Sequence, residues 1–468
     1  MKTKVLIIGA GPAGLTCGYQ ISKQKGYNCK IIEISKEVGG MARSIKIFDR
    51  IVDIGPHRFF SNDTRINKIW LEVVGHQYQM VNRTTRIYYK KKFFDYPLKP
   101  FNALFNLGII TSILCFLSYL KYLIFPKKDT SSFSNWITNR FGYKLYSIFF
   151  KTYTHKLWGI PPEELSSEFA RQRIKDFSLG EAVKQIFFKK NKHKTLVDQF
   201  AYPLYGNGFV YEKMKEKFLD KGGEIIFQKK IIQLEKNDSK FLVKFNNGEL
   251  ENFDYVVSSM PIDNFLESFK NYKSNIPKLR FRNTILVYTN ISRENIFKDQ
   301  WLYIQEENVK AGRITNFNNW VNTIKNNNKG TVLVNEYWTN EEDEMWLFND
   351  SKLRDLCVND LLSCGFIKDK FEVKDFKVVR VPKCYPIYSG DYKTEINKIQ
   401  SFIEGIDGLY LIGRYGSFKY NNQDHSILMG MLAAENITES KNNNLWNINT
   451  DYKYHESSTI SETGLKSN

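Results

Sequence analysis

The sequence predicts an α/β fold, in which a parallel sheet is assembled from separate stretches of the chain and two further substructures are inserted between them. Three observations predict this fold. A strand–helix–strand unit opens the chain, a helix-rich block runs from 101 to about 188, and an aromatic strand-rich block of antiparallel character spans about 284–381. With 468 residues, of which 42% are hydrophobic, the chain can bury more than one sizeable core.

Short apolar runs predict the strands of the parallel sheet. Val5–Ile8 and Lys30–Glu33 flank a helical stretch that reaches about Lys23, which together make a βαβ unit. Further strand-like runs follow at 224–227, 241–245, 255–258 and 409–412. Because the helix-rich and strand-rich blocks separate these runs, the parallel-sheet domain is expected to be discontinuous in sequence.

The turn after the first strand carries the pattern G-x-G-x-x-G. Its glycines are Gly9, Gly11 and Gly14. At this place the first glycine permits the tight turn, the second lets a pyrophosphate approach the backbone, and the third brings helix and strand together. Glu33 ends the second strand, where a carboxylate can accept hydrogen bonds from ribose hydroxyls. The opening therefore predicts a Rossmann-type dinucleotide site.

Further glycine elements specify the dinucleotide. Gly39, Gly40 and Arg43 follow the acidic strand and suit a second backbone approach to the pyrophosphate. This segment resembles the G-G-x-x-x-S element of FAD-dependent amine oxidases, protoporphyrinogen oxidases and UDP-galactopyranose mutases. Gly413, after an apolar strand, resembles the element that closes over the flavin in the same superfamily. The resemblance implies a Rossmann-type (GR2-like) FAD-binding domain, whose last helix directs its N-terminus at the flavin ring.

The C-terminal motif narrows the resemblance. The run G-R-Y-G-S-F-K-Y-N-N-Q-D-H-S, from Gly413 to Ser426, is similar to the signature of eukaryotic-type UDP-galactopyranose mutases. That similarity implies that Arg414 and Tyr420 face the substrate. It also implies a flavin-facing group that consists of Gln423, Asp424, His425 and Ser426. His425 is further expected to cap the last helix.

Other motifs of the same enzymes occur in the same order. Gly55-Pro56-His57 resembles their G-G-H, whose histidine packs near the isoalloxazine, and His57 is expected to have a positional role. Trp301-Leu302-Tyr303 with Arg313 resembles their diphosphate-binding residues, and Tyr385 resembles a further tyrosine of that site. The resemblance covers residues 5 to about 437.

Some positions depart from the mutase pattern. Lys151 stands where those enzymes carry a diphosphate arginine, so the charge is kept but the bidentate fork is lost. Trp320 stands where a tyrosine is expected, and the signature is shortened between Tyr420 and Gln423. These departures leave the nucleotide and the sugar open. Tyr96 is expected to line the cavity for a mutase and for an oxidase alike.

The resemblance implies a FAD-dependent mutase that interconverts the pyranose and furanose forms of a nucleotide-sugar for polysaccharide or glycan synthesis. Reduced flavin N5 would attack the anomeric carbon, with NAD(P)H as a plausible reductant, so the hard chemistry belongs to the cofactor. Catalytic roles are predicted for His57, Lys151, Arg313 and Arg414. The alternative is a FAD-dependent oxidoreductase of the amine oxidase or protoporphyrinogen oxidase type.

The domain boundaries follow from these assignments. FAD-binding segments are expected at 1–95, 201–270 and 396–440. A mainly helical substrate domain is expected at 96–200, an antiparallel-sheet substrate domain at 271–395, and a poorly ordered polar tail at 441–468.

Charge and cysteine usage bound the partners. The net charge of +18 favours an anionic partner, but no nucleic-acid-binding motif accompanies it. The six cysteines form no CxxC pair, so we expect no metal site and a cytoplasmic location. The oligomeric state is left open.

An apolar segment raises the question of membrane contact. Residues 103–120 carry no formal charge and reach the lower edge of transmembrane length. Polar residues within the segment argue against a membrane span, and a helix buried in the core is the favoured interpretation. An interfacial helix against a membrane is the first alternative, and a membrane span is the second.

Overall fold

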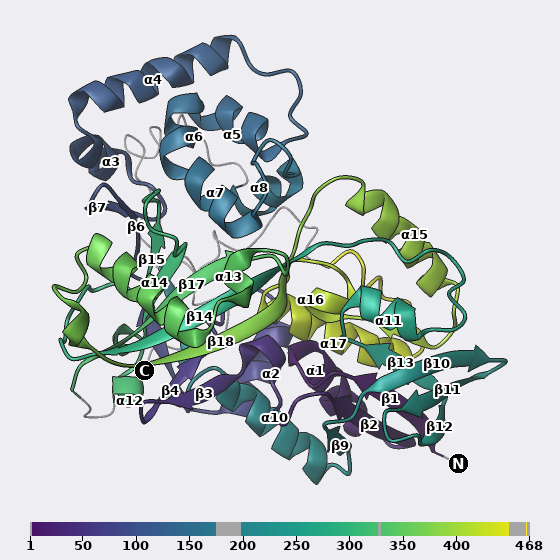
Figure 1. Ribbon diagram of the computed structural model, residues 1–468. Helices are drawn as coiled ribbons and strands as arrows, with labels where there is room; N and C mark the ends of the chain where they lie inside the picture. Colours follow the sequence, from purple (N-terminus) through teal and green to yellow (C-terminus); the bar gives the residue numbers. More distant parts are fainter. Residues whose placement is uncertain (1, 175–197, 326–328, 449–464, 466–468) are drawn as a thin grey trace.

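The computed structural model describes residues 2–174, 198–325, 329–448 and 465. Figure 1 shows a parallel sheet with its helices at one end of the molecule, a helical block at the other, and an antiparallel sheet between them. The predicted α/β fold with inserted helical and antiparallel substructures is confirmed.

The parallel sheet has the strand order β19-β13-β1-β2-β9, and every neighbouring pair is parallel. Its strands are β1 (Thr3–Ile8), β2 (Tyr27–Glu33), β9 (Glu224–Phe227), β13 (Tyr255–Ser258) and β19 (Leu409–Leu411). The predicted strand at 241–245 is confirmed as part of β11, which lies in a separate antiparallel sheet. That sheet consists of β10 (Ile231–Asn237), β11 (Lys240–Phe245) and β12 (Leu250–Phe253).

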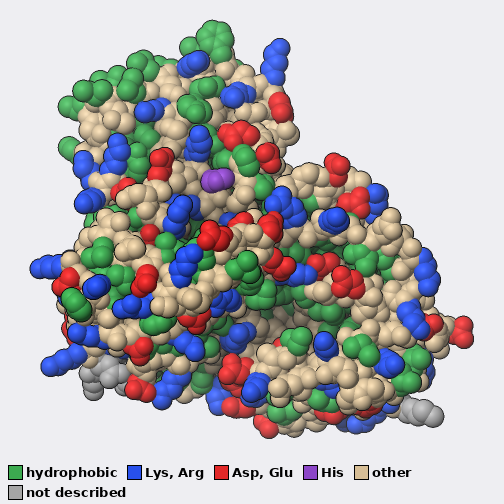
Figure 2. Space-filling model, viewed as in Figure 1, with side chains coloured by type: hydrophobic (Ala, Val, Ile, Leu, Met, Phe, Trp, Pro, Cys, Tyr) green, Lys and Arg blue, Asp and Glu red, His purple; other side chains and the backbone are tan. Residues whose placement is uncertain are grey.

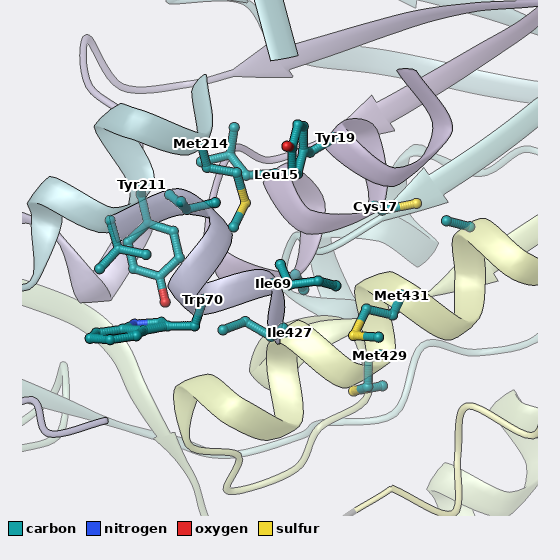
Figure 3. Packing of buried hydrophobic residues seen from close by; sticks show 14 of the residues in the cluster. Leu15, Cys17, Tyr19, Ile69, Trp70, Tyr211, Met214, Ile427, Met429 and Met431 are labelled. Carbon is teal, nitrogen blue, oxygen red and sulfur yellow. The ribbon is translucent and has the colours of Figure 1, made fainter. Parts of the chain in front are cut away.

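Four helices share one core beside the parallel sheet. They are α1 (Pro12–Ser22), α2 (Thr64–Val74), α10 (Gly208–Asp220) and α17 (Gln423–Thr438). Figure 3 shows their side chains together, with Leu15, Trp70, Met214 and Ile427 among them. A Cβ on Gly430 would lie 2.3 Å from the carbonyl oxygen of Ala13, so only glycine allows α17 to approach α1 this closely. The last helix is thereby held against the first.

The antiparallel sheet has the order β18-β14-β17-β16-β15-β6-β7. Its strands are β6 (Thr85–Tyr89), β7 (Lys92–Asp95), β14 (Phe281–Ile291), β15 (Trp301–Ile304), β16 (Arg313–Asn316), β17 (Thr331–Thr339) and β18 (Val373–Pro386). All neighbours are antiparallel except β15 and β6. Residues 85–95, which are expected in the first FAD-binding segment, thus form strands of this antiparallel sheet.

The helical block contains α3 (Pro100–Leu107), α4 (Ile109–Ile124), α5 (Phe133–Phe141), α6 (Tyr143–Phe149), α7 (Lys151–Trp158) and α8 (Ser167–Ile174). The favoured prediction of a buried core helix at 103–120 is wrong. Gly108 divides the segment into α3 and α4, and most of its large side chains are exposed. In the described residues, no helix is long and apolar enough to span a membrane.

Further strands and helices accompany these layers. They are β3 (Ser44–Ile47), β4 (Arg50–Asp53), β5 (Tyr78–Asn82), β8 (Gln199–Pro203), α11 (Ile262–Ser268), α12 (Asn322–Lys325), α13 (Glu344–Leu347), α14 (Asp350–Ser363), α15 (Tyr392–Glu404) and α16 (Gly413–Gly416). The tail departs from the expected disorder at its start, because Leu445 and Trp446 are buried against the core. Residues 449–464 and 466–468 of the predicted tail lie outside the described residues.

Candidate flavin and substrate site

One cavity of about 1020 Å³ connects the parallel sheet with the antiparallel sheet. Its wall includes the glycine turn after β1, Glu33 at the end of β2, and side chains of β15, β16, β17 and β18. The segment from Gly413 to Ser426 contributes as well. The cavity therefore brings together most of the residues that the sequence singles out.

The glycine turn has the geometry that a pyrophosphate site needs. Gly9 has φ of +101°, and a Cβ on Gly14 would lie 1.9 Å from the carbonyl oxygen of Gly9. The N-cap of α1 is Gly11, which has no side chain that could occupy the N–H groups of the helix. Pro12, the first helical residue, has no N–H, so the backbone donors that can meet an anion begin at Ala13, and the helix dipole favours anion binding there.

A second glycine pair forms the opposite side of this turn. Gly39 donates its N–H to the carbonyl oxygen of Ala10 over 2.8 Å, and Gly40 has φ of +53°. A Cβ on Gly40 would lie 3.3 Å from the Cα of Gly11, so bare backbone faces bare backbone here. Arg43 lines the same cavity and donates from Nη1 to the carbonyl oxygen of Gly40 over 3.0 Å. This cradle of glycine backbone and one guanidinium fits a dinucleotide pyrophosphate.

Glu33 lies where the ribose contact is predicted. It lines the cavity and is 8% exposed. One carboxylate oxygen accepts the N–H of Ala10 over 2.7 Å and the other accepts that of Ser35 over 2.9 Å. These two bonds fix the carboxylate, and an ionised carboxylate retains further lone pairs for ribose hydroxyls.

The C-terminal signature turns into α17 beside the same cavity. Gly413 has φ of +77°, and Gln423, Asp424 and Ser426 line the wall. The predicted cap is confirmed, since Nδ1 of His425 accepts the N–H of Asn422 in a capping box. His425 itself is absent from the cavity lining.

Gln423 joins three parts of the FAD-binding fold. Its Nε2 donates to the carbonyl oxygen of Arg58 over 3.2 Å and to Oδ1 of Asn207 over 2.9 Å. Its Oε1 accepts the hydroxyl of Tyr211 over 2.7 Å. The side chain therefore fixes the start of α17 against α10 and against the segment that carries His57.

His57 lines the cavity and makes a 3.1 Å contact from Nδ1 to the carbonyl oxygen of Gly55. Because a carbonyl only accepts, Nδ1 carries the proton and Nε2 is the free acceptor. Burial, followed by the positive charges of Arg414 and Arg313, lowers the pKa of His57 to about 3. The imidazole is therefore neutral near neutral pH.

Replacing His57 by asparagine is expected to leave the shape of the pH–kcat/KM profile unchanged between about pH 5 and pH 8, because the imidazole does not titrate there. The pH dependence of stability is opposite in sign to that of a histidine paired with an acid. As the pH falls from about 6.5 towards 3, the unfolded chain binds a proton at this position and the folded chain does not, so stability is lost. Melting temperatures of the wild type and of His57→Asn at pH 7 and pH 5 check this loss of stability. An inflection in the pH–kcat/KM profile that disappears when His57 is replaced would contradict the neutral imidazole.

Arg313 is held by a buried carboxylate that the sequence motifs do not include. It donates from Nε and Nη2 to the two carboxylate oxygens of Glu336, over 2.5 and 2.6 Å. Glu336 is 1% exposed and lies opposite Arg313 in the β16–β17 pairing. A glutamate in a strand that is otherwise uncharged is the one signal of it in the sequence. This two-point contact fixes the plane of the guanidinium in the cavity wall.

Arg414 is oriented by neutral acceptors. It donates to the carbonyl oxygen of Asn421, over 3.0 Å from Nε and 2.6 Å from Nη2, and to that of Cys384 over 3.1 Å. Its guanidinium carbon lies 4.8 Å from the ring centre of Tyr420 and 5.4 Å from that of Tyr385. Carbonyl groups leave its positive charge uncompensated, so Arg414 can attract an anion.

Tyrosines surround the two arginines. The rings of Tyr385 and Tyr420 stack with centres 5.3 Å apart, and Tyr303 joins them in the cavity wall. Burial raises the pKa of Tyr385 well above its usual value, so its hydroxyl remains a donor. The hydroxyl groups and guanidinium groups together can bind a phosphorylated or carboxylated ligand.

Two predicted substrate residues lie outside the cavity lining. Tyr96 is 43% exposed and contacts the ring of Tyr303, with centres 5.0 Å apart. Lys151 is exposed at the start of α7. Trp320, at the position expected for a tyrosine, is buried in the core against Tyr202 and Trp301. Roles for Tyr96 and Lys151 stay predictions.

Known proteins of similar sequence include two bacterial enzymes. A coproporphyrinogen III oxidase from Staphylococcus aureus is 22% identical over 93% of this chain and 99% of its own length. A probable UDP-galactopyranose mutase from Klebsiella pneumoniae is 28% identical, over 36% of this chain and 44% of its own.

Solved structures share the fold over nearly the whole chain. A reduced UDP-galactopyranose mutase superposes with a TM-score of 0.83 at 21% identity, and covers 97% of this chain and 100% of its own. A putative protoporphyrinogen oxidase from Exiguobacterium sp. 255-15 gives 0.74 at 15% identity, over 94% and 100%. The family model of flavin containing amine oxidoreductases matches residues 12–438. The chain therefore belongs to the flavin containing amine oxidoreductase family.

Proposed function

We propose that this protein is a FAD-dependent mutase that interconverts the ring forms of a nucleotide-sugar, with UDP-galactose as the first candidate. The observation that carries the proposal is the pair of oriented guanidinium groups, Arg313 and Arg414, in the cavity that also contains the glycine cradle. A nucleoside diphosphate gains negative charge as it leaves the sugar, and fixed cations stabilise that charge.

The residues of this chain would divide the work. Arg414 supplies uncompensated positive charge, and Arg313 supplies an oriented donor whose plane Glu336 sets. Tyr385 and Tyr420 would donate hydroxyl hydrogen bonds and cover the sugar. Neutral His57 would accept at Nε2 without adding a charge. Bound FAD in its reduced form supplies the nucleophile that the reaction needs.

The comparisons support this proposal in two ways. The structure that superposes with a TM-score of 0.83 is described as a reduced UDP-galactopyranose mutase. The relative from Klebsiella pneumoniae is described as a probable UDP-galactopyranose mutase. The motif run from Gly413 to Ser426, which resembles the mutase signature, contributes Arg414 and Tyr420 to the cavity wall. NAD(P)H as the physiological reductant is part of the proposal.

Oxidation of a porphyrinogen is the second candidate. It is favoured by the coproporphyrinogen III oxidase of Staphylococcus aureus, which matches 93% of this chain. The carboxylates of such a substrate would also use Arg313 and Arg414. The two candidates differ in electron balance, because an oxidase consumes an acceptor and a mutase leaves substrate and flavin at their starting redox state.

A turnover assay separates them. Purified protein with FAD is incubated under nitrogen with UDP-galactofuranose, with dithionite or NADPH as reductant, and the products are separated by chromatography. We expect UDP-galactopyranose from the reduced protein and none from the oxidised protein. A protein that leaves the nucleotide-sugar unchanged and, in a parallel assay in air, consumes oxygen with coproporphyrinogen III would contradict the proposal.

A further inference from the structure

Helices α3 and α4 form an apolar outer face that the described residues of the chain leave exposed. More than half of the exposed large hydrophobic side chains in the described chain lie between Phe101 and Phe125. Phe105 is 80% exposed and Ile110 78%. In Figure 1, α4 lies along the outer edge of the helical block, away from the parallel sheet. A contiguous surface of this kind marks an interaction site.

The inner side of α4 accounts for its attachment to the protein. Cys115 is the side chain of α4 that is buried, and Ser118 accepts the N–H of Lys144 at the start of α6. The backbone at Tyr119 approaches Gly142 so closely that a Cβ there would lie 2.6 Å from the amide nitrogen. Helix α4 is thus anchored along one side, while Ile110, Leu114 and Leu117 project outwards.

The charge of this segment is predominantly positive. Residues 96–128 contain Lys99, Lys121, Lys127 and Lys128 and no aspartate or glutamate, while Asp95 and Asp129 flank the segment and Asp95 lies 3.4 Å from Nζ of Lys99. All four lysines are exposed. Figure 2 shows hydrophobic side chains gathered along the upper edge of the molecule, with lysine and arginine side chains at the border. An apolar face bordered by lysines complements a surface with an apolar interior and negative headgroups.

We propose that the α3–α4 face, residues 101–125, binds the surface of an anionic lipid bilayer. Neither helix could cross a bilayer, since α3 ends at Leu107 and α4 has 16 residues. The helices lie in the interface, with phenylalanine and isoleucine side chains among the acyl chains and the lysines at the headgroups. Binding there places the protein at a membrane through helices that do not span it, and does not depend on its substrate.

Sedimentation with vesicles tests the proposal on the full chain with FAD. Vesicles of phosphatidylcholine alone are compared with vesicles of equal parts phosphatidylcholine and phosphatidylglycerol. We expect binding to the anionic vesicles that falls as salt is raised. Phe105→Glu should weaken it by at least about tenfold, because a charge enters the apolar layer. The matched control is Phe371→Glu, which changes a similarly exposed phenylalanine outside this face and should bind like the wild type.

Further variants decide between explanations. Replacing Lys121, Lys127 and Lys128 together by glutamine should weaken binding by about tenfold or more. Flavin absorbance checks that each variant is folded. Failure to bind anionic vesicles, or equal binding to both compositions, would overturn the proposal. So would a concentration-dependent dimer that Phe105→Glu abolishes in protein that binds no vesicles, because the face would then be covered by a second copy.

Discussion

Replacing Arg313 by alanine is expected to lower kcat/KM for the nucleotide-sugar by about 10²–10³, because an oriented donor to the leaving diphosphate is lost. The flavin should remain bound, since Arg313 lies on β16, apart from the glycine cradle. Activity is measured with the reduced protein and compared with the flavin content. Arg313→Lys keeps the charge but not the two-point contact with Glu336, and should recover only part of the activity.

A control is needed because Arg313→Ala also leaves Glu336 buried without its partner. Such a buried charge costs about 3–5 kcal/mol when its partner is removed. The double variant Arg313→Leu with Glu336→Leu removes both charges and should recover stability without recovering activity. Thermal unfolding and turnover are measured on all variants. Recovery of turnover in the double variant would show that Arg313 serves folding rather than the reaction.

Replacing Gly14 by alanine is expected to weaken FAD binding strongly. The added Cβ would lie 1.9 Å from the carbonyl oxygen of Gly9, so the turn and the start of α1 must separate. Overpacking of this kind costs about 3 kcal/mol, which corresponds to roughly 100-fold in Kd when it acts on the bound form. The ratio of flavin to protein absorbance after purification measures the loss.

Two alanine variants make this test specific. At Gly11 the nearest protein atom to an added Cβ is the Cα of Gly40, at 4.0 Å, so Gly11→Ala should fold normally and lose FAD only by obstructing the pyrophosphate. Gly405→Ala is the neutral control, since Gly405 has φ of −78° and ends a surface helix. Wild-type FAD affinity in Gly11→Ala would mean that the pyrophosphate lies elsewhere.

The sequence is most informative where function depends on local backbone. Roles for Gly9, Gly14 and Gly39 follow from the motif alone, because a short approach of backbone to backbone or a positive φ excludes other residues. The capping role of His425 is similarly local, since helix and cap are adjacent in the chain.

Contacts between distant strands cannot be predicted in the same way. Glu336 meets Arg313 through the register of β16 and β17, which the composition of either strand does not reveal. The apolar content of 103–120 favours a core position, but its neighbours decide burial, and they leave its outer side uncovered. Lys151 matches an arginine by its position in the motif order, but the start of α7 leaves it exposed.

The central claim is that a nucleoside diphosphate leaves the anomeric carbon of a sugar in this cavity and returns. The most direct test uses UDP-galactose in which the oxygen that bridges the anomeric carbon and the β-phosphorus carries an isotope label. With the reduced protein we predict that the label moves into the non-bridging oxygens of the β-phosphate, as followed by phosphorus NMR. A label that stays in place while the reduced flavin is present would contradict the claim.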